Sequence, residues 1–189
     1  MGKVYEALEG RLREFILAQP VFFVGTAPTG TDGHVNVSPK GVSGSFAVLD
    51  ERTVAYLDYG GSGIETVAHL RDNGRIVLMF CAFDGPPKIV RLHGRGEPVL
   101  LDDPRFGDLA ACFPGVPFVG ARAIIVVAVT RISDSCGYAV PLMRYEAGRT
   151  LLAESSARKG PERLAMDRAA KNGVSIDGLP GLDRGGHNT

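Results

Sequence analysis

A glycine-rich turn, Gly60-Gly61-Ser62-Gly63, follows an apolar run and precedes a segment with helical spacing. The first amides of a helix lack intrahelical partners and carry partial positive charge, so they can bind an anion such as phosphate. The hydroxyls of Ser62 and Thr66 would add hydrogen bonds to such an anion. Glu65 opposes this interpretation, because its carboxylate would compete for the same amides. An ordinary glycine-rich connection explains the pattern equally well.

A second group of polar residues lies upstream, in the run His34-Val35-Asn36-Val37-Ser38-Pro39-Lys40. A strand repeats every two residues, so His34, Asn36 and Ser38 share one face and the valines share the other. Lys40 follows a proline, and its ammonium could meet a phosphate or an electron-rich ring. A solvated lysine in a loop is the alternative.

Three arginines are further candidates for ligand contacts. Arg91 and Arg95 share one face of a predicted strand, and Arg122 opens the most apolar strand of the chain. Surface ion pairs explain such arginines as well as ligand contacts do.

The three cysteines, Cys81, Cys112 and Cys136, are widely separated and form no CxxC pair. This usage predicts a reducing compartment and no metal site. Cys136 could act as a nucleophile with His93 or His34 as its base, although a free cysteine more often behaves as a small buried hydrophobe.

The elements that must position these groups are mostly short strands separated by glycine-rich turns. This pattern predicts a mainly β protein, a β-barrel with helical insertions. We expect one domain over residues 1–189, with a core at about 20–145 and a C-terminal helical extension at about 159–180. The expected helices span 5–18, 64–72, 102–113 and 159–172. The expected strands span 21–27, 34–38, 46–49, 53–58, 75–80, 88–101 and 123–141.

Composition excludes several classes of protein. Of the 189 residues, 44% are hydrophobic and 22% are charged, a mixture typical of globular proteins and unlike disordered chains. The 21 basic residues balance the 21 acidic ones, so the chain lacks the positive charge that non-specific binding to nucleic acid requires. No apolar run reaches the roughly 18 residues of a membrane span, and no apolar signal core is found near the N-terminus. We therefore expect a cytoplasmic protein that binds neither nucleic acid nor membrane.

Several segments together resemble the pyridoxamine 5′-phosphate oxidase-related flavoproteins, in a branch distinct from the true vitamin B6 oxidases. They include 34–41, 54–58, 61–75 and the runs Gly120-Ala121-Arg122-Ala123 and Ser135-Cys136-Gly137-Tyr138. The similarity extends over about residues 10–145, with a shorter match at 171–180. The resemblance implies an FMN-binding split β-barrel that forms a homodimer, with FMN between the two subunits.

The chain departs from this family at residues that bind the FMN phosphate. Relatives carry two basic residues on the second strand of the first hairpin, and here Lys40 matches the second while Val35 occupies the first position. The true oxidases carry an Arg-Lys pair before the short helix, and Glu65 and Thr66 stand there. Pyridoxamine phosphate is therefore a poor candidate for the substrate, and phosphate binding must rest on amides, hydroxyls and other cations.

The resemblance also implies that Tyr56 and Leu57 lie against the flavin ring. We expect an FMN-dependent oxidoreductase that acts on an unidentified small molecule, and no catalytic residue can be named. A non-catalytic protein that binds a flavin, a deazaflavin or haem is the alternative, and a thiol enzyme that uses Cys136 is a second. The residues expected to bind the cofactor are Asn36, Ser38, Lys40, Tyr56, Leu57, Asp58, Ser62 and Thr66.

Overall fold

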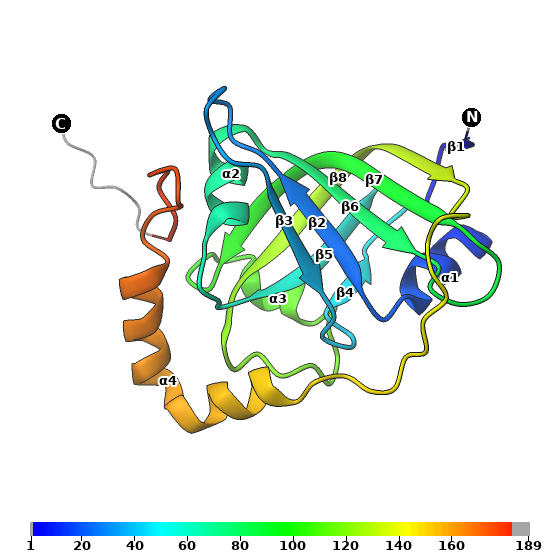
Figure 1. Ribbon diagram of the computed structural model, residues 1–189. Coiled ribbons are helices and arrows are strands. Elements are labelled where there is room, and N and C mark those ends of the chain that lie inside the picture. Colours follow the sequence, from blue (N-terminus) through cyan, green and yellow to red (C-terminus); the bar gives the residue numbers. More distant parts are fainter. Residues whose placement is uncertain (1, 183–189) are drawn as a thin grey trace.

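The computed structural model describes residues 2–182, and residues 1 and 183–189 of the predicted domain lie outside this range. Strands dominate the described chain, and its helices lie around them (Figure 1). The elements are β1 (Val4–Tyr5), α1 (Gly10–Ala18), β2 (Phe22–Thr26), β3 (Asn36–Lys40), β4 (Phe46–Val48), β5 (Thr53–Tyr59), α2 (Glu65–Asn73), β6 (Arg75–Cys81), β7 (Ile89–Leu100), α3 (Phe106–Ala110), β8 (Ala121–Ser135) and α4 (Leu151–Lys171).

The strands form one antiparallel sheet that curls into a half-barrel (Figure 1). The strand order is β3-β2-β6-β7-β8-β5-β4, and β1 pairs with β8 outside this path. The two longest strands, β7 and β8, have 12 and 15 residues and lie near the middle of the sheet. The prediction of a mainly β fold with helical insertions is confirmed.

Both faces of the sheet are buried around β5 and β8, because side chains along these strands alternate between two apolar clusters. On β8, Ile125 and Val127 point into the larger cluster, whereas Ile124 faces the smaller one. α1 and α2 contribute to the larger cluster, and α3 packs against the smaller one. Each fully buried aliphatic side chain contributes about 1.5–3 kcal/mol, so the two clusters hold the sheet as a firm frame for the polar groups.

The N-terminal segment differs from the prediction of one helix over residues 5–18. Val4 and Tyr5 pair with β8, and α1 begins only at Gly10. Two contacts fix this strand: the Tyr5 hydroxyl donates a hydrogen bond to Asp134, and the Lys3 amide donates to the same carboxylate at 2.8 Å. Both contacts join residues more than 100 positions apart, so the local spacing of apolar residues gave no sign of them.

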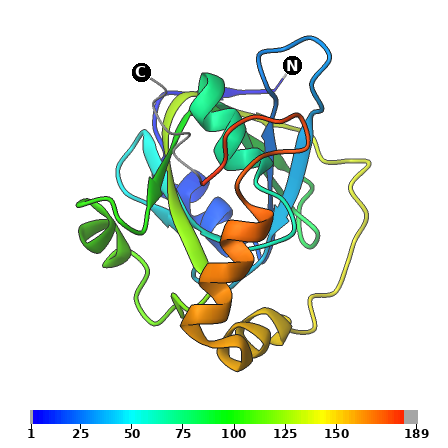
Figure 2. The same ribbon diagram turned by 90° about the vertical axis from the view of Figure 1, so that its left-hand side faces the viewer.

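The C-terminal helix is longer than the predicted 159–172. α4 begins at Leu151 and bends at Gly160, whose φ of 71° is left-handed and is followed by Pro161. Figures 1 and 2 show the two halves of α4 meeting at an angle below the sheet. The helix predicted over 102–113 is shorter in the structure, where α3 has the five residues Phe106–Ala110. The strand predicted over 123–141 ends with β8 at Ser135.

β3 confirms the predicted alternation, but it places the polar side chains inside. Asn36, Ser38 and Lys40 are half-buried, whereas Val37 is 66% exposed. The strand covers Asn36–Lys40, so His34 and Val35 precede it. β3 ends the sheet and pairs only with β2 among the described strands, so one of its backbone edges is unpaired. The exposed side chain of Val37 shows that the outer face of β3 also reaches the solvent.

Candidate functional site

A hydrogen-bonded polar network occupies the inner face of β3. The Asn36 amide donates to the hydroxyls of Thr26 at 3.2 Å and Thr66 at 3.1 Å. The Ser38 hydroxyl donates to the Asn36 carbonyl oxygen at 3.2 Å. Asn36 therefore connects β2, β3 and the first turn of α2, and it brings together three of the predicted site residues.

His69 ends this network inside the core, where its side chain is fully buried. Its Nδ1 lies 3.0 Å from the Thr26 hydroxyl, and its buried Nε2 has no hydrogen-bond partner among the described residues. Burial lowers the pKa of the imidazole below its usual value, although Asp177, Glu65 and Asp72 oppose the shift. The ring is therefore neutral at pH 7.

A buried ion triad lies at the C-terminal end of β3. Lys40 Nζ and Arg122 Nε each lie 2.7 Å from a different oxygen of Asp58. The side chains of Asp58, Arg122 and Lys40 are 0%, 6% and 18% exposed. Burial would raise the pKa of the Asp58 carboxyl, but the two cations and their hydrogen bonds outweigh it and lower the pKa. Asp58 is therefore ionised at neutral pH and committed to these two partners.

A β-bulge explains how Arg122 reaches Asp58. Asp58 pairs with Ala123 and Tyr59 pairs with Ala121, so Arg122 has no partner in the β5–β8 register. An extra residue in one strand redirects the local side chains. The bulge turns Arg122 toward the face that carries Asp58.

Arg122 also binds the glycine-rich turn and the C-terminal segment, residues 172–182, which follows α4. Its guanidinium donates to the Gly63 carbonyl at 2.6 Å and to Asn172 Oδ1 at 3.1 Å. The Asn172 amide in turn donates to the Gly61 carbonyl at 3.3 Å. The sequence did not identify Asn172 as a site residue, because its partners lie about 50 and 110 positions away.

The protein's own groups cover the start of α2. The Glu65 carboxylate folds back against Gly63, where a methyl group would collide with it. Glu65 also accepts a hydrogen bond of 3.3 Å from the Ile176 amide of the C-terminal segment. Thr66 is buried. The competition expected from Glu65 is thus present in the structure, and the first turn of α2 offers an anion little access.

Tyr56 and Leu57 are buried on opposite faces of β5. The Tyr56 ring packs 5.5 Å from Phe22 and 5.8 Å from Lys40 Nζ, measured at its centre, while Leu57 belongs to the smaller apolar cluster. The Tyr56 hydroxyl has no hydrogen-bond partner among residues 2–182. Burial, with a further contribution from Asp58, raises the pKa of the phenol well above its usual value. Their contact with a flavin ring stays a prediction, since both side chains point into the fold.

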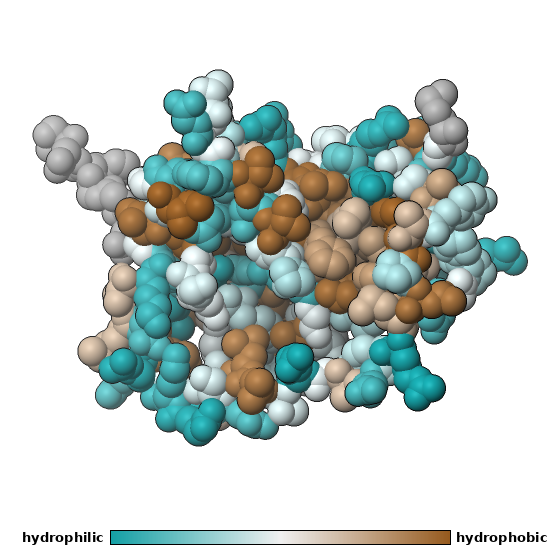
Figure 3. All heavy atoms as spheres, viewed as in Figure 1, coloured by the Kyte–Doolittle hydropathy of each residue, from teal (hydrophilic) through white to brown (hydrophobic). Residues whose placement is uncertain are grey.

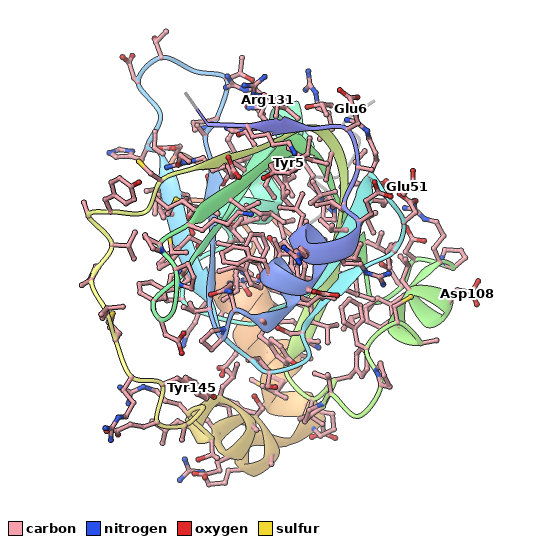
Figure 4. The ribbon with its side chains drawn as sticks, turned by 90° about the vertical axis from the view of Figure 1, so that its right-hand side faces the viewer. Tyr5, Glu6, Glu51, Asp108, Arg131 and Tyr145 are labelled. Carbon is pink, nitrogen blue, oxygen red and sulfur yellow. The ribbon has the colours of Figure 1, made fainter. Side chains whose placement is uncertain are left out.

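An aromatic cavity of about 610 Å³ opens beside Lys40. Phe22, Phe46 and Phe80 form one wall, with ring centres 5.1–5.4 Å apart. Another wall belongs to the extended segment 141–150, which runs outside the sheet to α4 and carries Tyr145 (Figure 4).

The remaining sequence candidates lie apart from these groups. Arg91 donates to the Ser135 hydroxyl at 3.0 Å, and Arg95 donates to the Asn73 carbonyl. Cys136 is exposed, and no described residue forms a hydrogen bond with its thiol. His34, one suggested base for it, binds Asp177 at 2.7 Å.

Two features are absent from the part of the chain that the structure describes. Within residues 2–182, no three His, Cys, Asp or Glu side chains gather closely enough to hold a metal ion. No helix in the same range combines the length and apolar composition of a membrane span.

The comparisons with known proteins agree with this architecture. A family model described as pyridoxamine 5′-phosphate oxidase matches residues 8–136. This range contains the network around Asn36, the ion triad and the glycine-rich turn. The chain belongs to this family. The pyridoxamine 5′-phosphate oxidase family protein ustO of Aspergillus flavus is 40% identical over 196 residues, which cover 94% of this chain and 77% of that protein.

Two crystal structures of HupZ from Group A Streptococcus share the fold. A HupZ variant superposes with a TM-score of 0.54 at 20% identity, covering 68% of this chain and 99% of that chain. A second HupZ structure gives 0.50 at 20% identity, covering 71% and 94%. At this level of identity the likeness concerns the fold alone, and it agrees with the predicted split β-barrel.

Proposed function

We propose that this chain is a homodimeric oxidoreductase that binds FMN and acts on a small molecule. The observation that carries the proposal is the family match over residues 8–136, which contains every residue that the sequence analysis assigned to the cofactor. Six of the eight fall into the groups described above: Asn36, Ser38 and Thr66 share one network, Lys40 and Asp58 share the ion triad, and Ser62 lies in the adjoining turn.

The donor set suits a flavin mononucleotide in two respects. Ser38 and Asn36 present neutral hydrogen-bonding groups on the half-buried face of β3, which match the polar edge of a flavin or its ribityl hydroxyls. Lys40 adds a positive charge whose position is fixed by Asp58 and by the Tyr56 ring beneath it. Tyr56 and Leu57 would support the site from inside the core.

When bound, FMN supplies hydride chemistry, and the protein's part is position and electrostatics. Lys40 would hold a fixed positive charge near the cofactor, because Asp58 prevents its ammonium from swinging into solvent. Asp58 and Arg122 are engaged with each other and are buried, so neither is free to exchange protons with a substrate. The aromatic cavity beside Lys40 suits an apolar or planar substrate.

An absorbance spectrum of the purified protein, followed by anaerobic addition of NADH or NADPH, tests this function. We expect flavin bands from bound FMN that bleach on reduction. Lys40→Ala should weaken FMN retention, while the control Lys88→Ala should not, because Lys88 pairs with Asp134 at 3.7 Å and lies outside the proposed site. Failure to bind FMN at micromolar concentration would refute the proposal.

The homodimer rests on apolar side chains that one copy leaves exposed. Val35 and Val37 on the outer face of β3 are 73% and 66% exposed, and Val174 and Ile176 of the C-terminal segment are similarly exposed. Figure 3 shows apolar atoms over β3 and the C-terminal segment on this face. Exposed apolar side chains that gather on one face are typical of a protein interface.

Sedimentation analysis tests this interface. We expect wild-type protein to sediment as a dimer and Val37→Asp to sediment as a monomer. The control Leu101→Asp places the same charge at an exposed residue in the turn after β7 and should leave the dimer intact. A monomeric wild type would refute the proposed dimer but would not bear on the proposal that the protein binds FMN.

A non-catalytic protein that binds a flavin, a deazaflavin or haem is a second candidate. The pairing of Lys40, Asp58 and Arg122 favours it, because the triad leaves none of these groups free for proton transfer. Binding of FMN without reduction by any nicotinamide or artificial electron donor would support this candidate over the oxidoreductase.

The proposal also places the protein in the cytoplasm. The three cysteines are unpaired, as expected in a reducing compartment. Recovery of the native protein in a membrane or secreted fraction would contradict this location.

A further inference from the structure

A second cavity, of about 250 Å³, lies between the glycine-rich turn and α4. The turn contributes Gly60, Gly61 and Ser62, and β8 is preceded at the cavity wall by Gly120. The opposite wall belongs to both halves of α4. Neither Glu65 nor Ile176 lines this cavity.

The helical repeat explains why α4 lines the cavity along its length. Its first half contributes Leu152, Ser155, Ser156 and Lys159, which recur at intervals of three or four residues. After the bend at Gly160, the second half contributes Leu164, Asp167, Arg168 and Lys171 with the same repeat. The bend thus turns one face of each half toward the same cavity.

The cavity carries a net positive charge. Lys159, Arg168 and Lys171 contribute three positive charges and Asp167 one negative charge, which gives +2. Asp167 is already paired with Lys159 at 2.7 Å and with Arg163 at 3.3 Å. No described residue forms a hydrogen bond with the side chain of Arg168 or Lys171, so their donors can serve a ligand.

Small polar groups complete the wall between these cations. Ser62 from the turn and Ser155 from α4 both line the cavity. Ser156 packs so closely on Gly120 that a methyl group there would lie 2.5 Å from its hydroxyl oxygen. This contact, together with the bond from Asn172 to Gly61, fixes α4 against the turn.

We propose that this cavity binds a phosphate monoester dianion through Arg168 and Lys171, and that the phosphate group of FMN occupies it. The identity of the ligand rests on the proposed function, while the preference for phosphate rests on the cavity itself. Arginine and lysine bind phosphate oxygens through charge-assisted hydrogen bonds. The cations missing before α2 are thus supplied by α4, more than 100 residues further along the chain.

Comparing FMN with riboflavin tests the phosphate site, because the two differ only in that group. We expect wild-type protein to bind FMN more tightly than riboflavin in a fluorescence titration. The double variant Arg168→Ala/Lys171→Ala should lose at least about 10-fold of FMN affinity and keep its riboflavin affinity. The control Arg158→Ala removes a cation from the same helix outside the cavity lining and should bind FMN as the wild type does.

A third variant decides between this cavity and the start of α2. If phosphate were held by the first amides of α2, Glu65→Gln would strengthen FMN binding, and the double variant would bind FMN as the wild type does. That pair of results would overturn the proposal and leave flavin binding intact.

Inorganic phosphate separates failure of this proposal from failure of the proposed function. If the wild type binds neither flavin but phosphate raises its melting temperature, and the double variant does not respond, the cavity is a phosphate site and the flavin assignment is wrong. If phosphate stabilises neither protein and the double variant keeps its FMN affinity, the cavity proposal is wrong.

Discussion

Replacing Asp58 by Asn should destabilise the protein more than any other single change of similar size in the ion triad. Asn keeps the shape of the side chain but removes its charge. Arg122, which is only 6% exposed, would then be a buried cation without a counter-ion. Removing one partner of a buried ion pair costs about 3–5 kcal/mol, since the remaining charge stays desolvated.

The contacts support a loss in the lower half of that range. Asp58 accepts two charge-assisted hydrogen bonds of 2.7 Å, and each such bond contributes about 1.5–3 kcal/mol. Asn can still accept one bond through its carbonyl, so we expect a loss of about 3–4 kcal/mol. Small domains are stable by about 5–15 kcal/mol, and this loss would lower the midpoint of urea unfolding markedly without changing the slope.

Lys40→Met is the matched control in this measurement. It keeps most of the lysine stem and leaves the Asp58–Arg122 pair intact, and Lys40 is the most exposed member of the triad. We expect a smaller loss of about 1.5–2 kcal/mol, near the low end for one hydrogen bond between charged groups, because Arg122 still neutralises the Asp58 carboxylate. Equal losses for the two variants would show that the triad does not stabilise the fold through Asp58.

The pH dependence gives an independent check. The folded-state pKa of Asp58 is lowered, so its stabilising contribution is present above the unfolded pKa of about 3.9 and is lost as the pH falls through the folded pKa. Asp58→Asn should remove this acid-dependent component. A loss below about 1 kcal/mol, with an unchanged acid-unfolding profile, would refute the reasoning.

Three further predictions concern the groups around the triad. Gly120→Ala should lower the melting temperature and the free energy of unfolding by about 1–3 kcal/mol, because Gly120 has a φ of +88° and little room beside Ser156. Adding Ser156→Ala should restore only the part of this loss that comes from the collision with Ser156. In an NMR titration, His69 should take up its proton at a pH below its usual pKa, because burial disfavours the charged imidazole. The unfolded chain binds this proton more readily, so stability should decline as the pH falls below about 6.5. A His69 signal that titrates above that value would contradict its burial. Asp177→Asn should speed amide hydrogen exchange in the C-terminal segment, because Asp177 binds the backbone and side chain of His34 near the surface. The free energy of unfolding should change by less than about 1 kcal/mol. Unchanged exchange rates would show that this contact does not hold the segment.

The sequence predicted the strands well because their signals are local. Runs such as 53–58 and 75–80 combine β-branched residues with flanking turns, and β5 and β6 match them within one residue. α2 was predicted with similar accuracy, because Gly74 ends it in the left-handed conformation that favours glycine.

The site was predicted only in part, because long-range contacts decide which groups are free. Asn36 and Ser38 lie on one face of β3, as the alternation of the strand suggested. Thr66 joins them from α2, a contact that no local pattern predicted. The pairing of Lys40 with Asp58 depends on two strands that are not neighbours in the sheet, and no local pattern reveals it. The bulge at Arg122 is also set by strand register, which the sequence of one strand does not determine.

The composition of β3 also limits how this protein can aggregate. An edge strand with unpaired backbone groups invites another strand to extend the sheet. Pro39 has no amide hydrogen to donate, and the charge of Lys40 follows it at the end of the strand. Another strand therefore pairs poorly with this edge, so the sheet does not readily extend from one molecule to the next. The exposed side chain of Val37 can still pack against a second copy of the chain.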